Sequence, residues 1–219
     1  MTKNGRIAQS RRCGEKMITQ LMMDVDGVLV TGRPSDGLPW KTDLEADLGV
    51  SPEDLHEAFF RPYWSDIVTG KRALHAVLGN VLTDIAPHLS SSELIDYWFA
   101  NDARLEESVL EAMENLRKPG MQVYLATNQD TLRAQYLWDD LGLKVYADGM
   151  LSSARLSAAK PDPEFFMRAS NHTNAPVSEH LLIDDSQANT AAAKAAGWHA
   201  YHWTGAEALG DVVQRFQSG

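Results

Sequence analysis

Residues 20–32 read QLMMDVDGVLVTG and place two acids, Asp24 and Asp26, directly after a short apolar run. The run 21–23 is typical of a buried β-strand, where a carboxylate is costly unless it is paired, hydrogen-bonded or bound to a metal. The two acids therefore indicate either that this run is not buried or that distant parts of the chain supply their partners.

Composition and charge narrow the classes of protein. The 219-residue chain has 20 Lys and Arg against 30 Asp and Glu, which gives a formal net charge of −10. That balance argues against nucleic acid or an anionic membrane as the main partner, but not against a small anionic substrate. No apolar run approaches the ~20 residues of a membrane span. The single cysteine, Cys13, excludes an internal disulfide and favours a reducing, cytoplasmic setting.

The order of the segments predicts an α/β core with an inserted helical cap. Residues 1–20 are basic and are expected to form a solvated tail. The Gly- and Pro-rich segment TGRPSDGLPW then leaves the first strand, and the runs that follow have the three- and four-residue apolar spacing of helices. We therefore expect a cap at 35–102 and a core made of 21–34 and 103–219.

Beyond residue 106, strands and helices alternate. Apolar runs predict strands at MQVYLATN, LKVYADG, HLLIDD and WHAYHW. Helices are expected at SVLEAMENLRKPG, DTLRAQYLWDDLG and QANTAAAKAAG, and another should open at Asp162-Pro163. This alternation predicts a Rossmann-like, doubly wound and mostly parallel sheet.

Three of the expected strands run from apolar residues into polar ones. In open parallel sheets, ligands bind at the carboxyl ends of the strands, so these polar residues should meet at one edge. A lysine just before the helix at 163 should lie at the same edge. The residues concerned are Asp24, Asp26, Thr127, Asn128, Asp184, Asp185 and Lys160.

The chemistry of this set favours a divalent cation and a phosphoryl group. Several carboxylates in one cleft repel each other unless a metal ion and a lysine compensate them. Oxygen ligands without a Cys or His cluster favour Mg²⁺, which also binds substrate phosphate. A hydroxyl, an amide and an ammonium group beside such an ion make a binding site for a phosphoryl group.

The four motifs DVDGVLV, LATN, AAKPDPEFF and LLIDDSQAN together resemble those of the haloacid dehalogenase-like hydrolase superfamily. They occur in the family's order and span residues 21–203. The resemblance is to the phosphatase-type subfamily with a helical cap between the first and second motifs. It implies a Mg²⁺-dependent phosphatase that hydrolyses small phosphate monoesters, sugar phosphates among them, through an aspartyl-phosphate intermediate.

The resemblance also implies roles for single residues. Asp24 would be the nucleophile, and Asp26 the general acid that later activates water. Thr127 and Asn128 would hold the phosphoryl oxygens, and Lys160 would neutralise charge. The metal ligands would be the Asp24 side chain, the Asp26 carbonyl and the pair Asp184 and Asp185, with Asp185 favoured as the direct ligand. Many relatives have a further Asp where this chain has Asn189.

Several alternatives remain at this point. Arg61 and Trp64 of the cap are candidates for substrate binding, although Trp64 also suits packing and Arg61 the surface. A phosphomutase of the β-phosphoglucomutase type has the same core and cap. Asp26 argues against a dehalogenase in the strict sense. The order of the motifs argues against a phospho-accepting receiver. A non-catalytic binding relative is the remaining alternative. The expected partner is a small phosphorylated metabolite, and the expected state a monomer or homodimer.

Overall fold

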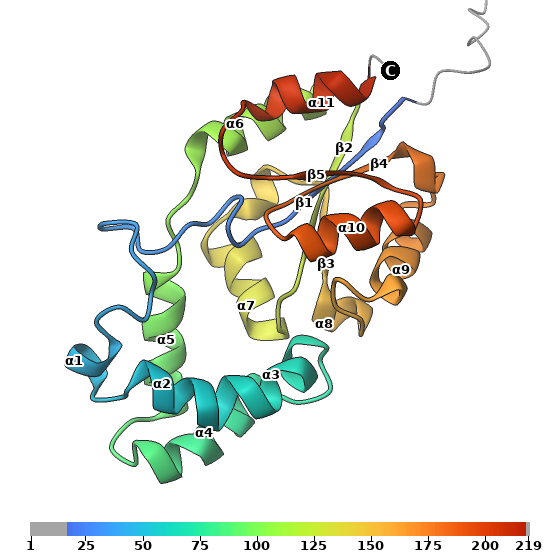
Figure 1. The fold of residues 1–219 in the computed structure, drawn as a ribbon. Coiled ribbons are helices and arrows are strands. Elements are labelled where there is room, and N and C mark those ends of the chain that lie inside the picture. Colours follow the sequence, from blue (N-terminus) through green and yellow to red (C-terminus); the bar gives the residue numbers. More distant parts are fainter. Residues whose placement is uncertain (1–16, 218–219) are drawn as a thin grey trace, which may run out of the picture.

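The computed structural model describes residues 17–217 (Figure 1). Most of the predicted basic tail and Cys13 therefore lie outside the described residues. None of the helices within 17–217 has the length and apolar character needed to cross a membrane.

The core is a parallel sheet, as the sequence predicts, and it has five strands. Its order is β3-β2-β1-β4-β5, and every neighbouring pair is parallel. The strands are β1 (Gln20–Met23), β2 (Gln122–Thr127), β3 (Gly149–Ser152), β4 (His180–Asp184) and β5 (His199–His202). The first strand in the chain thus lies at the centre, and the segment that follows it leaves from the middle of the sheet.

Helices cover both faces of the sheet, which explains why the strand residues are apolar in succession. Leu21 and Met23 of β1 pack on one face with α6 (Glu107–Arg117) and α11 (Leu209–Gln217). Met22 points to the other face, with α9 (Pro163–Thr173) and α10 (Gln187–Ala195). Side chains alternate along a strand, so a strand buried on both faces requires an unbroken apolar run.

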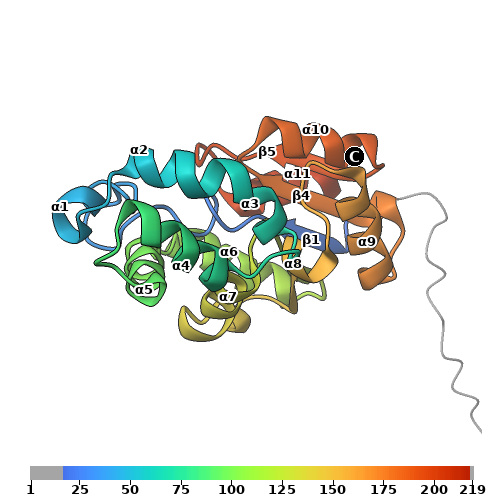
Figure 2. The ribbon, with the colours of Figure 1, turned by 90° about the horizontal axis from the view of Figure 1, so that it is seen from below.

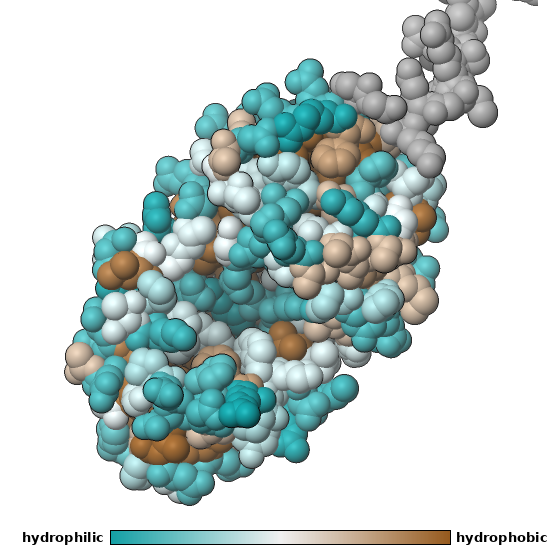
Figure 3. All heavy atoms as spheres, in the orientation of Figure 1, coloured by the Kyte–Doolittle hydropathy of each residue, from teal (hydrophilic) through white to brown (hydrophobic). Residues whose placement is uncertain are grey.

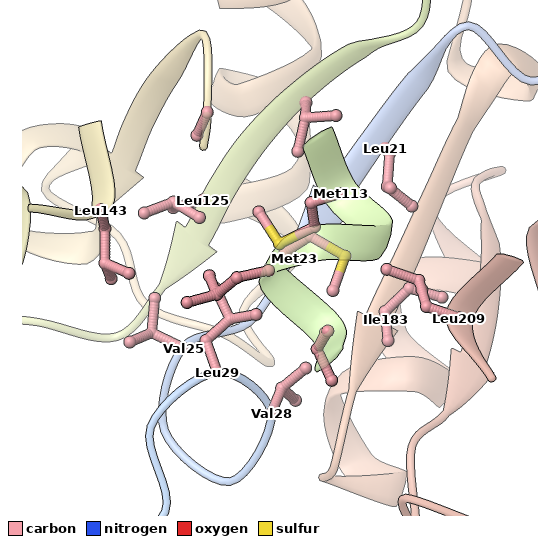
Figure 4. Close-up of a cluster of buried hydrophobic side chains, with 14 of the residues drawn as sticks. Leu21, Met23, Val25, Val28, Leu29, Met113, Leu125, Leu143, Ile183 and Leu209 are labelled. Carbon is pink, nitrogen blue, oxygen red and sulfur yellow. The ribbon is translucent and has the colours of Figure 1, made fainter. Parts of the chain in front are cut away.

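The polar DVDG loop is fixed by its own apolar residues. Val25, Val28 and Leu29 are fully buried and point into the cluster beneath β1 and β2 (Figure 4). The Val25 carbonyl also accepts hydrogen bonds from the N–H groups of residues 28, 29 and 30 at 2.8–3.2 Å. Burial of these side chains holds Asp26, which lies between Val25 and Val28, exposed at the edge of the sheet.

The expected strand at LKVYADG is wrong. Residues Leu143–Val145 form a short 3₁₀ helix, and the edge strand β3 begins only at Gly149. Gly142 takes a left-handed conformation with φ of 80° and turns the chain before this segment. Leu143 and Ala147 are buried whereas Val145 is 61% exposed, so the apolar residues follow a helical turn and not a strand.

Helices between β1 and α6 form a separate group with its own apolar core. They are α1 (Leu44–Leu48), α2 (Pro52–Leu55), α3 (Arg61–Val68), α4 (Leu74–Ile85) and α5 (Ser91–Asn101), with a π-helical turn, His56–Phe60, between α2 and α3. Their buried residues, such as Phe59, Leu78 and Trp98, cluster separately from those of the sheet. Figures 1 and 2 place this group beside the end of the sheet that carries α7 (Thr131–Gln135) and α8 (Ser153–Leu156).

Candidate active site

The acidic cluster is built where three adjacent parallel strands end. Met23 of β1 is in register with Leu125 of β2 and Ile183 of β4, so the residues that follow come together. Asp24 donates its N–H to the Ile183 carbonyl at 2.9 Å. Thr127 and Asp184 close the neighbouring strands and are buried. The expected meeting of strand ends at one edge is present in the structure.

Lys160 lies between two of the carboxylates. Its ammonium is 3.0 Å from Asp24 Oδ1 and 2.5 Å from Asp184 Oδ2, and the side chain is fully buried. Asn128 holds the lysine in place: its Oδ1 accepts from the Lys160 N–H at 2.8 Å, and its Nδ2 donates to the Lys160 carbonyl at 2.7 Å. The Asn128 side chain therefore acts on the lysine backbone in this structure.

Burial and neighbouring charges shift the pKa values of this group. Burial raises the pKa of Asp24 to about 7; Lys160 opposes this effect, and Asp184 and Asp26 add to it. Burial disfavours the charged Lys160, but the carboxylates of Asp24 and Asp184 outweigh burial and raise its pKa. Burial, followed by the charge of Asp184, raises the pKa of Asp185. One lysine is therefore too little positive charge for the cluster.

Asp184 and Asp185 are adjacent in sequence but have different surroundings. Asp184 is fully buried and accepts hydrogen bonds from Lys160, from the Ser186 N–H at 2.9 Å and from Asn189 Nδ2 at 3.0 and 3.2 Å. Asp185 is exposed. Gly27, at φ of 77°, faces it so closely that a Cβ would lie 2.2 Å from Asp185 Oδ2. The glycine lets this carboxylate lie against the DVDG loop.

The residues present fit a hard divalent cation. Asp24, Asp184 and Asp185 each offer a carboxylate oxygen, and these oxygens all lie within 4.8 Å of one another. All three donors are oxygens, which is the ligand set of Mg²⁺. Such an ion would balance the negative charge around the buried Asp24 carboxylate, whose pKa is raised.

Asp26 lies on the exposed side of the loop and has a partner that the sequence reasoning missed. Gln129 Nε2 donates to Asp26 Oδ2 at 2.7 Å and lies 3.4 Å from the Thr127 hydroxyl. The Gln129 side chain is buried. Its position two residues after a polar strand end, in LATNQD, was the available signal.

A second missed group joins the helical cap to the sheet. Arg133 of α7 is 1% exposed and donates to the carbonyls of Phe99 and Asp102, which end α5. Its guanidinium also lies 3.4 Å from the Asp102 carboxylate and over the rings of Phe99 and Tyr136. Burial, followed by the charge of Asp26, raises the pKa of Asp102 to about 6. The sequence gives no signal for this role of Arg133, because main-chain partners leave no trace in the sequence.

Arg61 and Trp64 lie in the cap, in a different hollow from the strand-end cluster. They line a pocket of about 350 Å³ whose other walls are Trp40, Lys41, Leu44, Pro52, Leu55, His56 and Phe60. None of these is a strand-end residue. Arg61 pairs with Glu57 at 2.6 Å and is largely exposed, whereas the Trp64 ring lies 5.7 Å from that of Trp98. Figure 3 shows a hydrophilic hollow in the middle of the face seen in this view.

Comparison with known proteins identifies the class. A family model described as haloacid dehalogenase-like hydrolase matches residues 19–197, so the chain belongs to that family. Phosphoglycolate phosphatase of Pseudomonas syringae pv. syringae is 25% identical over 202 residues, which cover 83% of this chain and 68% of that protein. Sesquiterpene phosphatase astK of Aspergillus oryzae is 25% identical over 191 residues, or 84% and 88% of the two chains.

A solved structure has the same fold. A haloacid dehalogenase-family enzyme of Bacteroides thetaiotaomicron, in complex with magnesium and inorganic phosphate, superposes with a TM-score of 0.74 at 18% identity. The match covers 89% of this chain and 98% of that one. Membership of the family, together with the phosphatase relatives, makes the chain a hydrolase of phosphoric monoesters.

Proposed function

We propose that this protein is a Mg²⁺-dependent phosphatase of small phosphate monoesters that forms an aspartyl phosphate on Asp24. The observation that carries the proposal is the Asp24 carboxylate at a buried strand end, 3.0 Å from the Lys160 ammonium and grouped with two further acids. The phosphatase relatives, and the magnesium and phosphate in the similar structure, support it.

The nucleophile is oriented by two contacts on one oxygen. The Val25 N–H donates to Asp24 Oδ1 at 2.8 Å, and Lys160 lies 3.0 Å from the same atom. These contacts fix the plane of the carboxylate and direct Oδ2 as the oxygen that attacks phosphorus. Asp26 protonates the leaving oxygen and then takes a proton from the water that hydrolyses the phosphoenzyme.

The remaining polar residues bind the phosphoryl group and the ion. Thr127 offers its hydroxyl to a phosphoryl oxygen, and Asn128 contributes through the position it gives Lys160. Asp24, Asp185 and the Asp26 carbonyl would hold Mg²⁺, with Asp184 beside them, and the ion would offset the charge of the phosphoryl group. Exposed Asp185 suits a direct ligand, whereas the oxygens of Asp184 already accept several hydrogen bonds.

The helical cap, residues 35–102, would close over the site and exclude water. Arg61 and Trp64 line their own pocket of the cap, so their contact with the organic part of the substrate requires closure to bring that pocket to the strand ends. Phosphorylated metabolites, sugar phosphates among them, are the class to be tested first. Relatives act on esters as different as phosphoglycolate and a phosphorylated sesquiterpene, so the screen should include both polar and apolar alcohols.

The test is phosphate release from a panel of phosphate monoesters, with Mg²⁺ or with excess chelator. We expect hydrolysis that needs Mg²⁺, that is lost in Asp24→Asn, and that is slowed by ~100-fold or more in Asp26→Asn. Asp211→Asn, an exposed acid on α11, is the matched control. Full activity in chelator would reject the role of the metal, and full activity of Asp24→Asn would reject the nucleophile. Transfer to a second sugar phosphate without release of phosphate would identify a mutase.

A further inference from the structure

Gln129 contacts both Asp26 and Thr127, and the motifs assign no role to it. Its Nε2 donates to Asp26 Oδ2 at 2.7 Å and lies 3.4 Å from Thr127 Oγ1. We propose that Gln129 is a positioning residue that selects which oxygen of Asp26 carries the catalytic proton. This inference rests on the proposed function, because it concerns the acid and base steps of that reaction.

The chemistry of the amide makes this selection. An amide N–H can only donate, and Asp26 Oδ2 can accept whether the carboxyl group is charged or neutral, provided that the proton lies on Oδ1. A proton on Oδ2 would face a donor and lose this hydrogen bond. The amide thus leaves Oδ1 to give its proton to the leaving oxygen and to take one from water, while Oδ2 stays bound in both steps.

Gln129 is itself held rigidly, so it can orient a more exposed partner. Gln129 is only 2% exposed, and its main-chain carbonyl accepts from the Ala154 N–H at 3.2 Å and from the Ser153 hydroxyl at 3.3 Å. Asp130, the next residue, caps α7 by accepting from the N–H groups of residues 132 and 133. The backbone on either side of Gln129 is therefore fixed by a strand end and a helix start.

Asp26 needs such support more than Asp24 does. Asp24 is buried and bound by Val25 and Lys160, whereas the Asp26 side chain is exposed. An exposed carboxylate samples several rotamers, and only some direct Oδ1 toward a leaving group. Because Gln129 also approaches the Thr127 hydroxyl, it sets the separation between the group that holds the phosphoryl oxygen and the group that supplies the proton.

The test separates leaving groups that need a proton from those that do not. Formation of the phosphoenzyme from p-nitrophenyl phosphate needs little protonation, whereas phenyl phosphate releases a much more basic oxygen. We expect Gln129→Met to lower kcat/KM for phenyl phosphate roughly 10- to 100-fold, the value of a hydrogen bond to a charged group. For p-nitrophenyl phosphate we expect kcat/KM to change little, and kcat to fall because hydrolysis of the phosphoenzyme still needs the base. Gln135→Met, an exposed glutamine on α7, is the control.

A second variant covers the case in which Gln129→Met does not fold. Gln129→Glu keeps the size of the side chain but replaces the donor with a carboxylate, which donates only when protonated. Its kcat/KM for phenyl phosphate relative to wild type should rise as pH falls. Equal losses for both substrates in Gln129→Met, or a ratio for Gln129→Glu that does not change with pH, would overturn the inference. An inactive wild type would instead reject the proposed function.

Discussion

Replacing Asp24 with Asn is expected to abolish phosphatase activity and, in the metal-free protein, to raise stability. The physical reason is that this carboxylate is buried with too little positive charge around it. Burial, with Asp184 and Asp26 nearby, raises its pKa from 3.8 to about 7 despite Lys160. Asn has the same shape without the charge, and its Oδ1 can still accept from the Val25 N–H and Lys160.

The size of the effect follows from the shift in pKa. A folded-state pKa raised by about three units corresponds to at most about 4 kcal/mol between the two protonation states. Part of this is offset because Asn attracts the Lys160 ammonium less strongly than a carboxylate does. We therefore expect a net gain of about 1–3 kcal/mol above pH 8, which for a chain of this length is roughly 3–10 °C in Tm.

The pH dependence has a defined direction. A raised pKa means that the folded protein binds the proton more tightly than the unfolded chain does. The stability from this proton is fully present below pH 3.8, and wild type loses it as pH rises through about 7. The variant has no such group. The difference in Tm between variant and wild type should therefore increase from pH 4 to pH 7 and stay constant at higher pH.

Thermal unfolding in chelator, measured from pH 5 to 9 for both proteins, tests this directly. Added Mg²⁺ should raise the Tm of wild type more than that of the variant, because a ligand stabilises the state that binds it. Asp211→Asn controls for the general loss of one negative charge. A metal-free Asp24→Asn protein that is less stable than wild type at pH 8 would refute the argument from burial.

Three further outcomes are expected. Asp185→Asn should raise the Mg²⁺ concentration for half-maximal activity about tenfold or more, measured by metal titration of the initial rate. Gly27→Ala should lower kcat roughly 100-fold with little change in secondary structure, because its Cβ would lie 2.2 Å from Asp185 Oδ2 and displace this group. Arg133→Met should lower the free energy of unfolding in urea by about 3 kcal/mol, because the half-buried Asp102 carboxylate loses its ion pair. A change below 1 kcal/mol would contradict the last of these.

The parallel sheet and the strand-end cluster could be predicted because both depend on simple regularities. Runs such as LMM and LLI are apolar throughout, which only a strand covered on both faces requires. Parallel strands bring their carboxyl ends to one edge, so Asp24, Thr127 and Asp184 had to approach each other once the strands were recognised. Pro163 after Asp162 likewise marked the start of α9, as the structure confirms.

Other features depend on contacts that a single sequence does not reveal. The spacing of Leu143 and Ala147 suits a strand and a helical turn alike, and only the packing of Leu143 on the sheet decides between them. Arginine side chains usually lie at the surface, but Arg133 is buried and donates to the main-chain carbonyls of Phe99 and Asp102 at the end of α5. Gln129 acquires its partner only because the loop of Asp26 turns back toward β2.

The charge of the cluster gives a reason for the amide at position 189, where the family resemblance implies a further Asp in many relatives. Asp24, Asp26, Asp184 and Asp185 carry four negative charges when ionised, and Lys160 compensates one. A divalent ion would compensate two more and leave the site near −1, ready for Thr127 and main-chain N–H groups to receive a phosphoryl group.

A carboxylate at position 189 would add a fifth negative charge directly against fully buried Asp184, where Asn189 now donates two hydrogen bonds. With an amide there, Asp184 accepts from Asn189 and also holds Lys160 close to Asp24. We therefore expect Asn189→Asp to raise the pKa of Lys160 further, because a third carboxylate would join Asp24 and Asp184, which already raise it. NMR titration of the ammonium measures this change, and an unchanged lysine pKa would contradict the argument from charge.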